Sequence, residues 1–292
     1  MAPWRQVLEA ATVIRPAIIV LSVGLMLGNM WTGAFRWRAL MMAYGSKSMP
    51  NLAFLARAYW VGTFYNTLLP ANVGGDVVRG HVTRNAFPES AAAPYVIVIV
   101  ERFFGLSGLI LVVLLVLSVH PVGQVSVPPT LAVMALLVAV CAAVGPSIAA
   151  RFGGRLGGRV GRALAGLPRP EKPAWFGVAL GLSLVTHSVA SVVNWLILRE
   201  LDPSVSLLDI MVLMPLALGV IYVPVTIAGL GVREAAFVVL LGEIGVSPVD
   251  ATVCSLTYLG VLVTMAAGGG VSHLIWPLSY PLTPDLEIPA DP

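Results

Sequence analysis

The chain has 292 residues, of which 58% are hydrophobic and only 11% are charged, and its mean hydropathy is +0.91. Ordinary soluble domains carry roughly 25% charged residues, so this composition excludes a soluble protein and predicts a surface solvated mostly by lipid. The net charge is +3, but the basic residues lie between continuously apolar runs, which argues against a nucleic-acid partner and against a β-barrel. We expect an all-α, polytopic helical membrane protein with about six to seven full spans.

In chain order, the sequence predicts a short interfacial helix over residues 1–15 and a first span over residues 17–31. The aromatic and basic run that closes this span is typical of a membrane interface; it comprises Trp31, Phe35, Arg36, Trp37 and Arg38. Further spans are expected over residues 52–69, 91–119, 130–150, 175–198, 207–223 and 248–276. Residues 77–85 and 232–242 are shorter than the roughly 20 residues that a span needs, so we interpret them as broken or re-entrant segments.

The segment 151–173 between two apolar spans is strongly basic. Its single acid, Glu171, is outnumbered by Arg151, Arg155, Arg159, Arg162, Arg169 and Lys172. Short loops rich in Lys and Arg stay in the cytoplasm, so we expect loop 151–173 to be cytoplasmic, with the basic stretch 79–84 on the same side. We treat residues 1–292 as a single transmembrane domain, with pseudo-repeat halves at about 31–150 and 174–276 joined by this loop.

Two segments far apart in the chain resemble each other. Residues 69–80 read LPANVGGDVVRG and residues 224–234 read PVTIAGLGVRE. A shift of 154 residues aligns Asn72 with Thr226 and matches four identical pairs: Pro70 with Pro224, Gly75 with Gly229, Val78 with Val232, and Arg79 with Arg233. We interpret the match as an internal repeat, and our hypothesis is that both segments face one site.

The residue types in these segments suit an anion. Pro and Gly interrupt a helix, and such a break inside a membrane is tolerated where protein or a cavity covers the exposed peptide groups. If helices restart at Val77 and Val232, their free N–H groups and the guanidinium groups of Arg79 and Arg233 could bind a phosphate. The candidate residues for an anionic lipid headgroup are Arg79, Arg233, Asn72, Gly74, Gly75, Asp76, Gly229, Gly231, Glu234, Glu101 and Arg102.

A structural interpretation of the same charges stays open. Arg79 could pair with Asp76, and Arg233 with Glu234 or Glu101. Glu101 and Arg102 are adjacent within an apolar span and point about 100° apart on a helix, so either each has its own structural partner or Arg102 joins the cavity.

Other polar and reactive side chains predict packing rather than chemistry. His187 and Asn194 share one helix face, for which a hydrogen bond between helices is expected rather than a proton relay. Cys141 and Cys254 lie in apolar runs and are expected in the core. Metal-ligand, nucleophile-elbow and phosphate-loop motifs are missing, so we expect no metal, no cofactor and no catalytic residues.

Four stretches resemble one known family. LPANVGGDVVRG, ERFFGLSGL at 101–109, VPVTIAGLGVREAAFVVLL at 223–241 and FRWRALMMAYG at 35–45 are similar to the lysylphosphatidylglycerol synthase transmembrane-region family, also called the flippase-like domain family. The resemblance implies a multi-pass protein of a bacterial-type inner membrane, related to the flippase portion of enzymes that aminoacylate phosphatidylglycerol. The soluble aminoacyl-transferring domain of the bifunctional relatives has no counterpart in these residues, so a stand-alone member without synthase activity is expected.

The expected function is a lipid translocase or permease for an anionic phospholipid or lipid-linked intermediate. Arg79 and Arg233 would approach a common cavity and hold the phosphate, while Asp76 and Glu234 would orient them. Two alternatives stay open. The first is an intramembrane enzyme that uses Asp76 or Glu101 as a base, and the second is a membrane subunit of a separately encoded lipid-modifying transferase.

Overall fold

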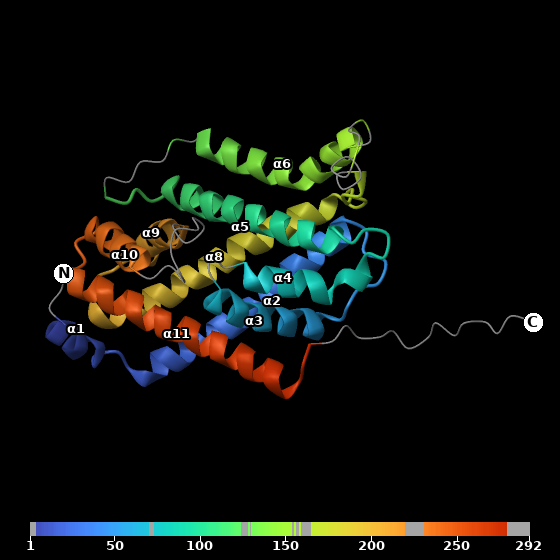
Figure 1. Ribbon diagram of the computed structural model, residues 1–292. Helices are drawn as coiled ribbons and strands as arrows, with labels where there is room; N and C mark the ends of the chain where they lie inside the picture. Colours follow the sequence, from blue (N-terminus) through green and yellow to red (C-terminus); the bar gives the residue numbers. More distant parts are fainter. Residues whose placement is uncertain are drawn as a thin grey trace, which may run out of the picture.

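A computed structural model describes residues 4–69, 73–123, 128, 130–153, 155, 158, 165–219 and 231–278. The long helices lie side by side in an elongated bundle (Figure 1). In chain order the elements are α1 (Trp4–Ala11), α2 (Pro16–Ala43), α3 (Leu52–Leu68), α4 (Gly74–Val82), the 3-10 turn η2 (Arg84–Ala86), α5 (Ala93–Leu117), α6 (Thr130–Gly153), α8 (Ala174–Leu201), α9 (Leu207–Gly219), α10 (Val232–Gly242) and α11 (Pro248–Ile275).

Local sequence signals set several helix starts. Proline occupies one of the first two positions of α2, α5 and α11, where its missing N–H would have no partner within the helix. The Asn51 side chain accepts a hydrogen bond from the Phe54 N–H at the start of α3 (2.8 Å), and Ser247 accepts from the Asp250 N–H at the start of α11 (3.1 Å). The ends of these helices are therefore encoded by neighbouring residues.

Five helices of the described part are long and apolar enough to cross a membrane: α2, α5, α6, α8 and α11. The protein is therefore a multi-pass helical membrane protein. The count falls below the six to seven spans expected from the sequence because α3 has 17 residues and α9 has 13. Part of the span expected at 207–223 lies outside the described residues.

The first span is longer than the sequence predicts. Helix α2 does not end at Trp31 but continues to Ala43. Trp31 and Phe35 are about half exposed, as an interface requires, whereas Trp37 is fully buried and Arg36 is 7% exposed. The assignment of Arg36 and Trp37 to a lipid–water interface was wrong, because their side chains pack against other helices.

The helices of the two halves follow the same order. Helices α2, α3, α4 and α5 contain 28, 17, 9 and 25 residues, and α8, α9, α10 and α11 contain 28, 13, 11 and 28. The 154-residue shift brings the start of each helix of the first set within a few residues of its counterpart in the second. The packing follows the same symmetry, because α2 contacts its own counterpart α8, α3 contacts α11, and α5 contacts α9.

The two sets run in opposite directions. At one end of the bundle, the Glu171 and Lys172 N–H groups just before α8 donate to the Ala43 carbonyl at the end of α2 (2.8 and 3.0 Å). At the other end, Arg15 just before α2 pairs with Glu200 at the end of α8 (2.5 Å). Helices α2 and α8 are therefore antiparallel, and we infer that α2–α5 and α8–α11 form an inverted repeat, with α6 outside it.

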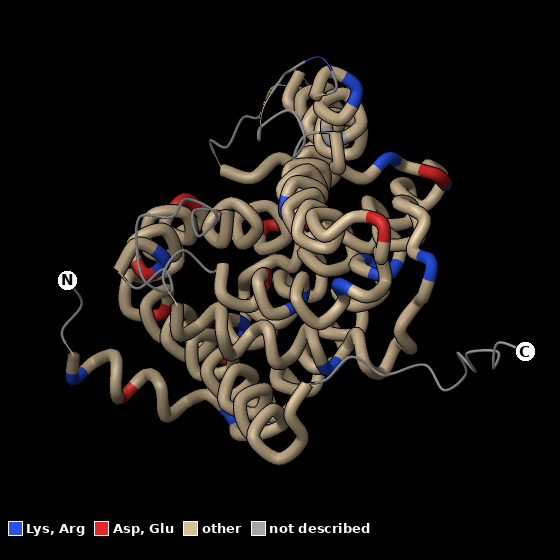
Figure 2. The backbone as a smooth tube through the Cα atoms, turned by 45° about the vertical axis from the view of Figure 1, so that its right-hand side comes forward, with Lys and Arg blue, Asp and Glu red and all other residues tan. Residues whose placement is uncertain are grey.

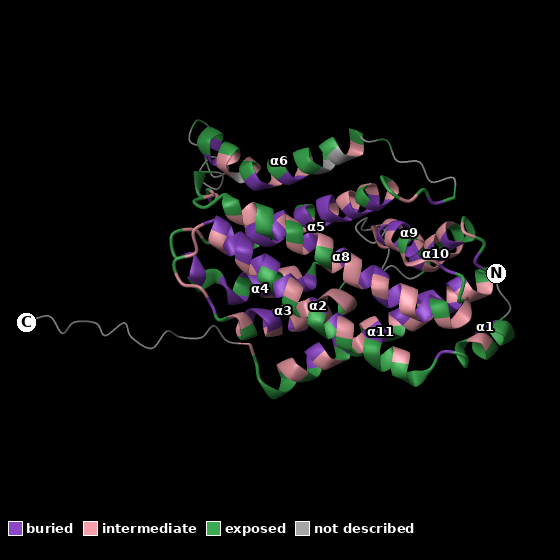
Figure 3. Ribbon diagram, turned by 180° about the vertical axis from the view of Figure 1, so that it is seen from behind, coloured by how far each residue is buried: buried purple, intermediate pink, exposed green. Residues whose placement is uncertain are grey.

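Two apolar clusters make up the core. One centres on α8–α11 and includes Leu213 and Phe237; the other joins α2–α5 and includes Trp37 and Phe104. Buried residues line the inside of both halves, whereas α6 shows much exposed surface (Figure 3). Charged residues occur at the ends of the bundle and also within it (Figure 2). These internal charges define the site described next.

Candidate functional site

Five charged side chains from three helices form a connected cluster near the contact between α2, α4 and α5. We call Arg36, Asp76, Arg79, Glu101 and Arg102 the charged cluster. Glu101 of α5, whose side chain is 2% exposed, pairs with Arg36 Nη2 of α2 (2.9 Å) and with Arg79 Nη1 of α4 (2.5 Å). A carboxylate is stable at such depth because two guanidinium groups compensate its charge.

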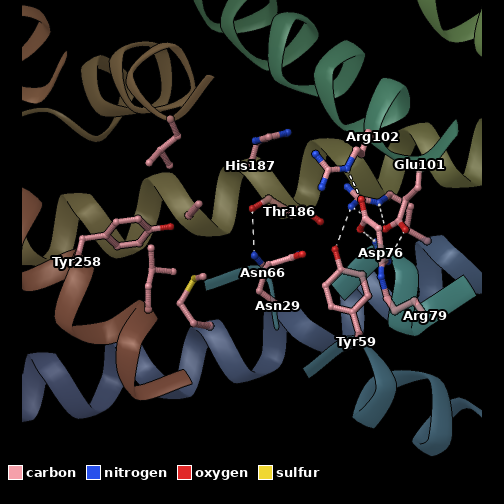
Figure 4. Close-up of a pocket in the computed structure, with 15 residues that line it drawn as sticks. Asn29, Tyr59, Asn66, Asp76, Arg79, Glu101, Arg102, Thr186, His187 and Tyr258 are labelled. Atoms are coloured by element: carbon pink, nitrogen blue, oxygen red, sulfur yellow. Dashed lines mark hydrogen bonds and ion pairs between the residues drawn. The ribbon is translucent and has the colours of Figure 1, made fainter. Parts of the chain in front are cut away.

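The second carboxylate extends the cluster toward solvent-accessible space. Asp76 pairs with Arg79 Nη2 (2.7 Å) and with Arg102 Nε. Cations and anions therefore alternate in the order Arg36, Glu101, Arg79, Asp76, Arg102. Figure 4 shows the last four of these residues close together. Over these five described residues, three arginines face two carboxylates, which leaves one net positive charge. Arg102 has the most exposed side chain of the five, at 33%.

Close packing of α4 on α3 sets the position of Arg79. A Cβ atom added at Gly75 would lie 2.1 Å from the Gly62 carbonyl oxygen, so only glycine allows this approach. The Asn66 side chain accepts a hydrogen bond from the Gly75 N–H (2.7 Å). The Arg79 guanidinium then lies over the Tyr59 ring, 4.6 Å from its centroid. These contacts hold the guanidinium in place before any ligand binds.

The sequence predicted that Gly74 and Gly75 bind the headgroup, and the packing of α4 assigns them a different role. Helix α4 restarts at Gly74 rather than at Val77. Gly74 packs against Leu69 and Tyr65, and the Gly75 N–H is engaged by Asn66. Both glycines are buried and allow two helices to approach each other, instead of opening backbone groups to a ligand.

The charged cluster lines one end of a cavity of about 350 Å³. Toward its other end the lining becomes neutral and then apolar (Figure 4). Its described lining residues are Met26, Asn29, Arg36, Tyr59, Asn66, Asp76, Arg79, Glu101, Arg102, Thr186, His187, Ala190, Leu218, Tyr258 and Leu262. A cavity with one cationic end and one apolar end fits an amphiphile with an anionic headgroup.

The arginine of the second half has a different setting. Arg233 is 1% exposed, pairs with Glu234 (2.6 Å) and donates to the Ser255 hydroxyl (3.3 Å). Glu234 also accepts from the N–H of Gly231, whose φ is +82°. Glu234 and Gly231 line a second cavity of about 880 Å³. Within the described part of the chain Arg233 does not line the cavity of the charged cluster, so these two arginines do not form the predicted common cavity.

Both structural pairings left open by the sequence are present. Arg79 pairs with Asp76, and Arg233 pairs with Glu234. Arg102 does join the cavity, and Glu101 pairs within the first half. Asn72 and Gly229 lie outside the described residues.

Two further predictions concern α8 and the cysteines. His187 bonds to the Gly105 carbonyl of α5 (2.9 Å), which confirms the expected link between helices. Asn194 donates to Ala190 of its own helix and receives a long contact from the Cys254 thiol of α11. Cys254 is buried as expected, whereas Cys141 is exposed on α6, so its assignment to the core was wrong.

Sequence reasoning missed several cavity residues. Asn29 and Tyr59 lie in apolar stretches, and Arg36 lies in the run that was assigned to the interface. The only signal was spacing, since Asn29 and Arg36 are seven residues apart and share one face of α2. The described residues contain no group of three or more His, Cys, Asp or Glu side chains that could hold a metal ion.

Comparison with known proteins agrees with this membrane architecture. No curated protein matches the chain. The model of the family described as "Lysylphosphatidylglycerol synthase TM region" matches residues 2–269, which is most of the chain and includes every helix of the charged cluster. The chain therefore belongs to the lysylphosphatidylglycerol synthase TM region family.

Proposed function

We propose that the protein binds the phosphate of an anionic lipid at Arg102 and moves that lipid between the two leaflets of the membrane. The observation that carries this proposal is the surplus positive charge of the charged cluster, placed where it faces a cavity. The Arg102 side chain is 33% exposed, while its ion-pair partner Asp76 is 15% exposed. A phosphate entering the cavity meets this guanidinium before the more deeply buried ones, and a guanidinium group is well suited to a phosphate.

The inverted repeat supports transport rather than binding alone. In secondary transporters, inverted repeats place the substrate site where the two halves meet, and rocking of one half against the other exposes the site alternately. The cavity here takes residues from both halves, including Arg36 of α2 and Thr186 of α8. These two helices are antiparallel, so the cavity lies at the junction about which such motion would occur.

The distribution of loop charge supports an orientation in a bacterial-type inner membrane. At one end, the segments between α2 and α3, between α4 and α5, and before α8 lie together: Ser90 donates to the Gly166 carbonyl (2.6 Å), and Lys47 pairs with Glu171 (3.8 Å). Arg84, Arg169 and Lys172 belong to these segments. By the positive-inside rule this basic end, with loop 151–173, faces the cytoplasm.

The test is lipid movement in reconstituted vesicles. Phosphatidylglycerol with a fluorescent acyl chain is followed as a membrane-impermeant reductant bleaches the outer leaflet. A hydrogen bond to a charged group contributes about 1.5–3 kcal/mol, so Arg102→Gln is expected to lower the initial rate at subsaturating lipid about tenfold to a hundredfold. Arg57→Gln is the matched control, because Arg57 bonds to Ser272 of α11 and does not line the cavity in the described part. Equal rates for wild type and Arg102→Gln would contradict the proposal.

The enzyme and subunit alternatives have less support from the geometry. Each candidate base, Asp76 or Glu101, already accepts from two arginines, so its oxygens are committed to ion pairs. Lipid mass spectrometry after gene deletion separates the cases. A missing lipid species favours an enzyme, whereas an unchanged lipid content with an altered leaflet distribution favours translocation. Co-purification of a transferase would favour the subunit role.

A further inference from the structure

We infer that Asn29 recognises a hydroxyl group on the lipid headgroup, so that the cavity selects anionic lipids with a polyol or sugar headgroup over lipids with a bare phosphodiester. This inference rests on the proposed function, because it concerns the headgroup of the lipid whose phosphate binds Arg102. It assigns a specificity-determining role to the neutral section of the cavity.

The Asn29 side chain has one hydrogen-bonding atom that is not used. Asn29 is 8% exposed and lines the cavity. Its Nδ2 donates to the Thr186 carbonyl oxygen of α8 (3.3 Å; Figure 4). A carbonyl oxygen can only accept, which fixes the orientation of the amide and makes Oδ1 the other atom. Within the described residues Asn29 Oδ1 has no hydrogen-bond partner.

An unused acceptor at this depth is costly. A buried acceptor without a partner destabilises a fold by about 1–3 kcal/mol, and most such groups are paired. Asn29 could satisfy both of its polar ends with a ligand in the cavity, whereas an apolar residue at this position would avoid the cost. The position of Asn29 supports a ligand, because it lies two helical turns from Arg36 on the same face of α2, between the charged cluster and Tyr258 (Figure 4).

The surroundings favour a hydroxyl over an ammonium group as the donor. The neutral section of the cavity is lined by Asn29, Asn66, Thr186, His187 and Tyr258, and it holds no carboxylate in the described part. The two carboxylates of the cavity are each held by two arginines. A headgroup ammonium would therefore meet a net positive cluster without a free carboxylate, while a hydroxyl adds no charge.

Three other polar side chains of this section have hydrogen-bond partners. His187 bonds to Gly105, the Thr186 hydroxyl donates to Leu182, and the Asn66 oxygen accepts from Gly75. Among the described residues of this section, Asn29 Oδ1 is a buried acceptor without a partner. A cavity water is the competing occupant, and it would satisfy Oδ1 without giving any headgroup selectivity.

The experiment compares two fluorescent lipids of equal charge in the same vesicles. Phosphatidylglycerol carries two headgroup hydroxyls, and phosphatidylmethanol carries none. A neutral hydrogen bond contributes about 1 kcal/mol, so the wild-type protein should move phosphatidylglycerol about fivefold faster at subsaturating lipid. Asn29→Ala should lower this ratio to near one, whatever its effect on the absolute rate for either lipid. A wild-type ratio of one, or an unchanged ratio in Asn29→Ala, would assign Oδ1 to water and overturn the inference.

A matched control comes from the same helix face. Ser22 lies seven residues before Asn29, is fully buried, and has a hydroxyl oxygen without a partner, but it does not line the cavity in the described part. Ser22→Ala should therefore keep the wild-type ratio. If Asn29→Ala does not fold, Asn29→Ser and the wild-type ratio decide the question. If wild type moves neither lipid, the proposed translocation fails, and the inference is judged by whether phosphatidylglycerol raises the Tm of the solubilised protein more than phosphatidylmethanol does.

Discussion

The two halves of the protein place an arginine in the same position but surround it differently. Arg79 contacts Glu101, and Arg233 contacts Ser255; both partners lie 22 residues further along the chain. In the first half the cluster gains a further arginine at position 102, where the second half has Leu256. The two halves share their helix order and a buried arginine, whereas among the described residues the surplus positive charge of the charged cluster lies in the first half.

The largest effect is expected in the labelling of single cysteines in the loops that follow α2 and α8. The reagent is a thiol reagent that does not cross the membrane. Lys47 follows α2 and Ser204 follows α8, so an inverted repeat puts these counterpart loops on opposite sides of the membrane. In a Cys141→Ser background, K47C should be labelled only after the cytoplasmic side is opened, and S204C should be labelled in intact cells. If K47C and S204C are both labelled from the same side, the two halves are not inverted relative to each other.

The next largest effect concerns the contrast between Glu101 and Ser255. Glu101→Gln leaves Arg36 and Arg79 without their shared buried carboxylate, and such uncompensated charge costs about 3–5 kcal/mol. Ser255→Ala removes a neutral partner of Arg233, which keeps Glu234, and should cost about 1 kcal/mol. Thermal unfolding of the purified proteins measures both. Similar Tm values for the two variants would mean that Glu101 has no greater structural role than its counterpart.

A smaller difference in stability is expected between substitutions of Gly75, which precedes Arg79, and Gly231, which precedes Arg233. Gly75→Ala places a methyl group against the Gly62 backbone, so α3 and α4 must separate, at about 1–3 kcal/mol. Gly231→Ala meets open space and suffers only from its positive φ, at about 1 kcal/mol. Gly75→Ala should also slow lipid movement, because α4 carries Asp76 and Arg79. A larger loss of Tm in Gly231→Ala would show that the α3–α4 contact is not the critical one.

The helical framework could be predicted because its signals are local. Long apolar runs place most helix ends within a few residues. Proline at helix starts and the caps at Asn51 and Ser247 are further local signals at the same positions. Three of the five members of the charged cluster, Asp76, Arg79 and Glu101, were identified because charges inside apolar sequence are costly and need a reason. Arg102 was recognised with Glu101, as its neighbour.

The rest of the site could not be predicted because it depends on which helix faces which. Arg36 was predicted to be interfacial because it lies in an aromatic and basic run, yet its own face of α2 packs against α5. Asn29 and Tyr59 are neutral residues within apolar stretches, and such residues commonly form contacts without function. Their common orientation toward one cavity is a property of packing.

The sequence by itself determined that this is a multi-pass helical membrane protein, and that α4 and α10 are short segments that each carry an arginine. These features depend on composition, periodicity and residues close together in the chain. Only the tertiary structure decided that Arg79 lines the cavity of the charged cluster while Arg233 does not, and that Arg36 and Arg102 join Arg79 around two carboxylates. Arg36 and Glu101 are 65 residues apart in sequence, and the charge of a site is the sum over groups that only folding brings within a few ångströms.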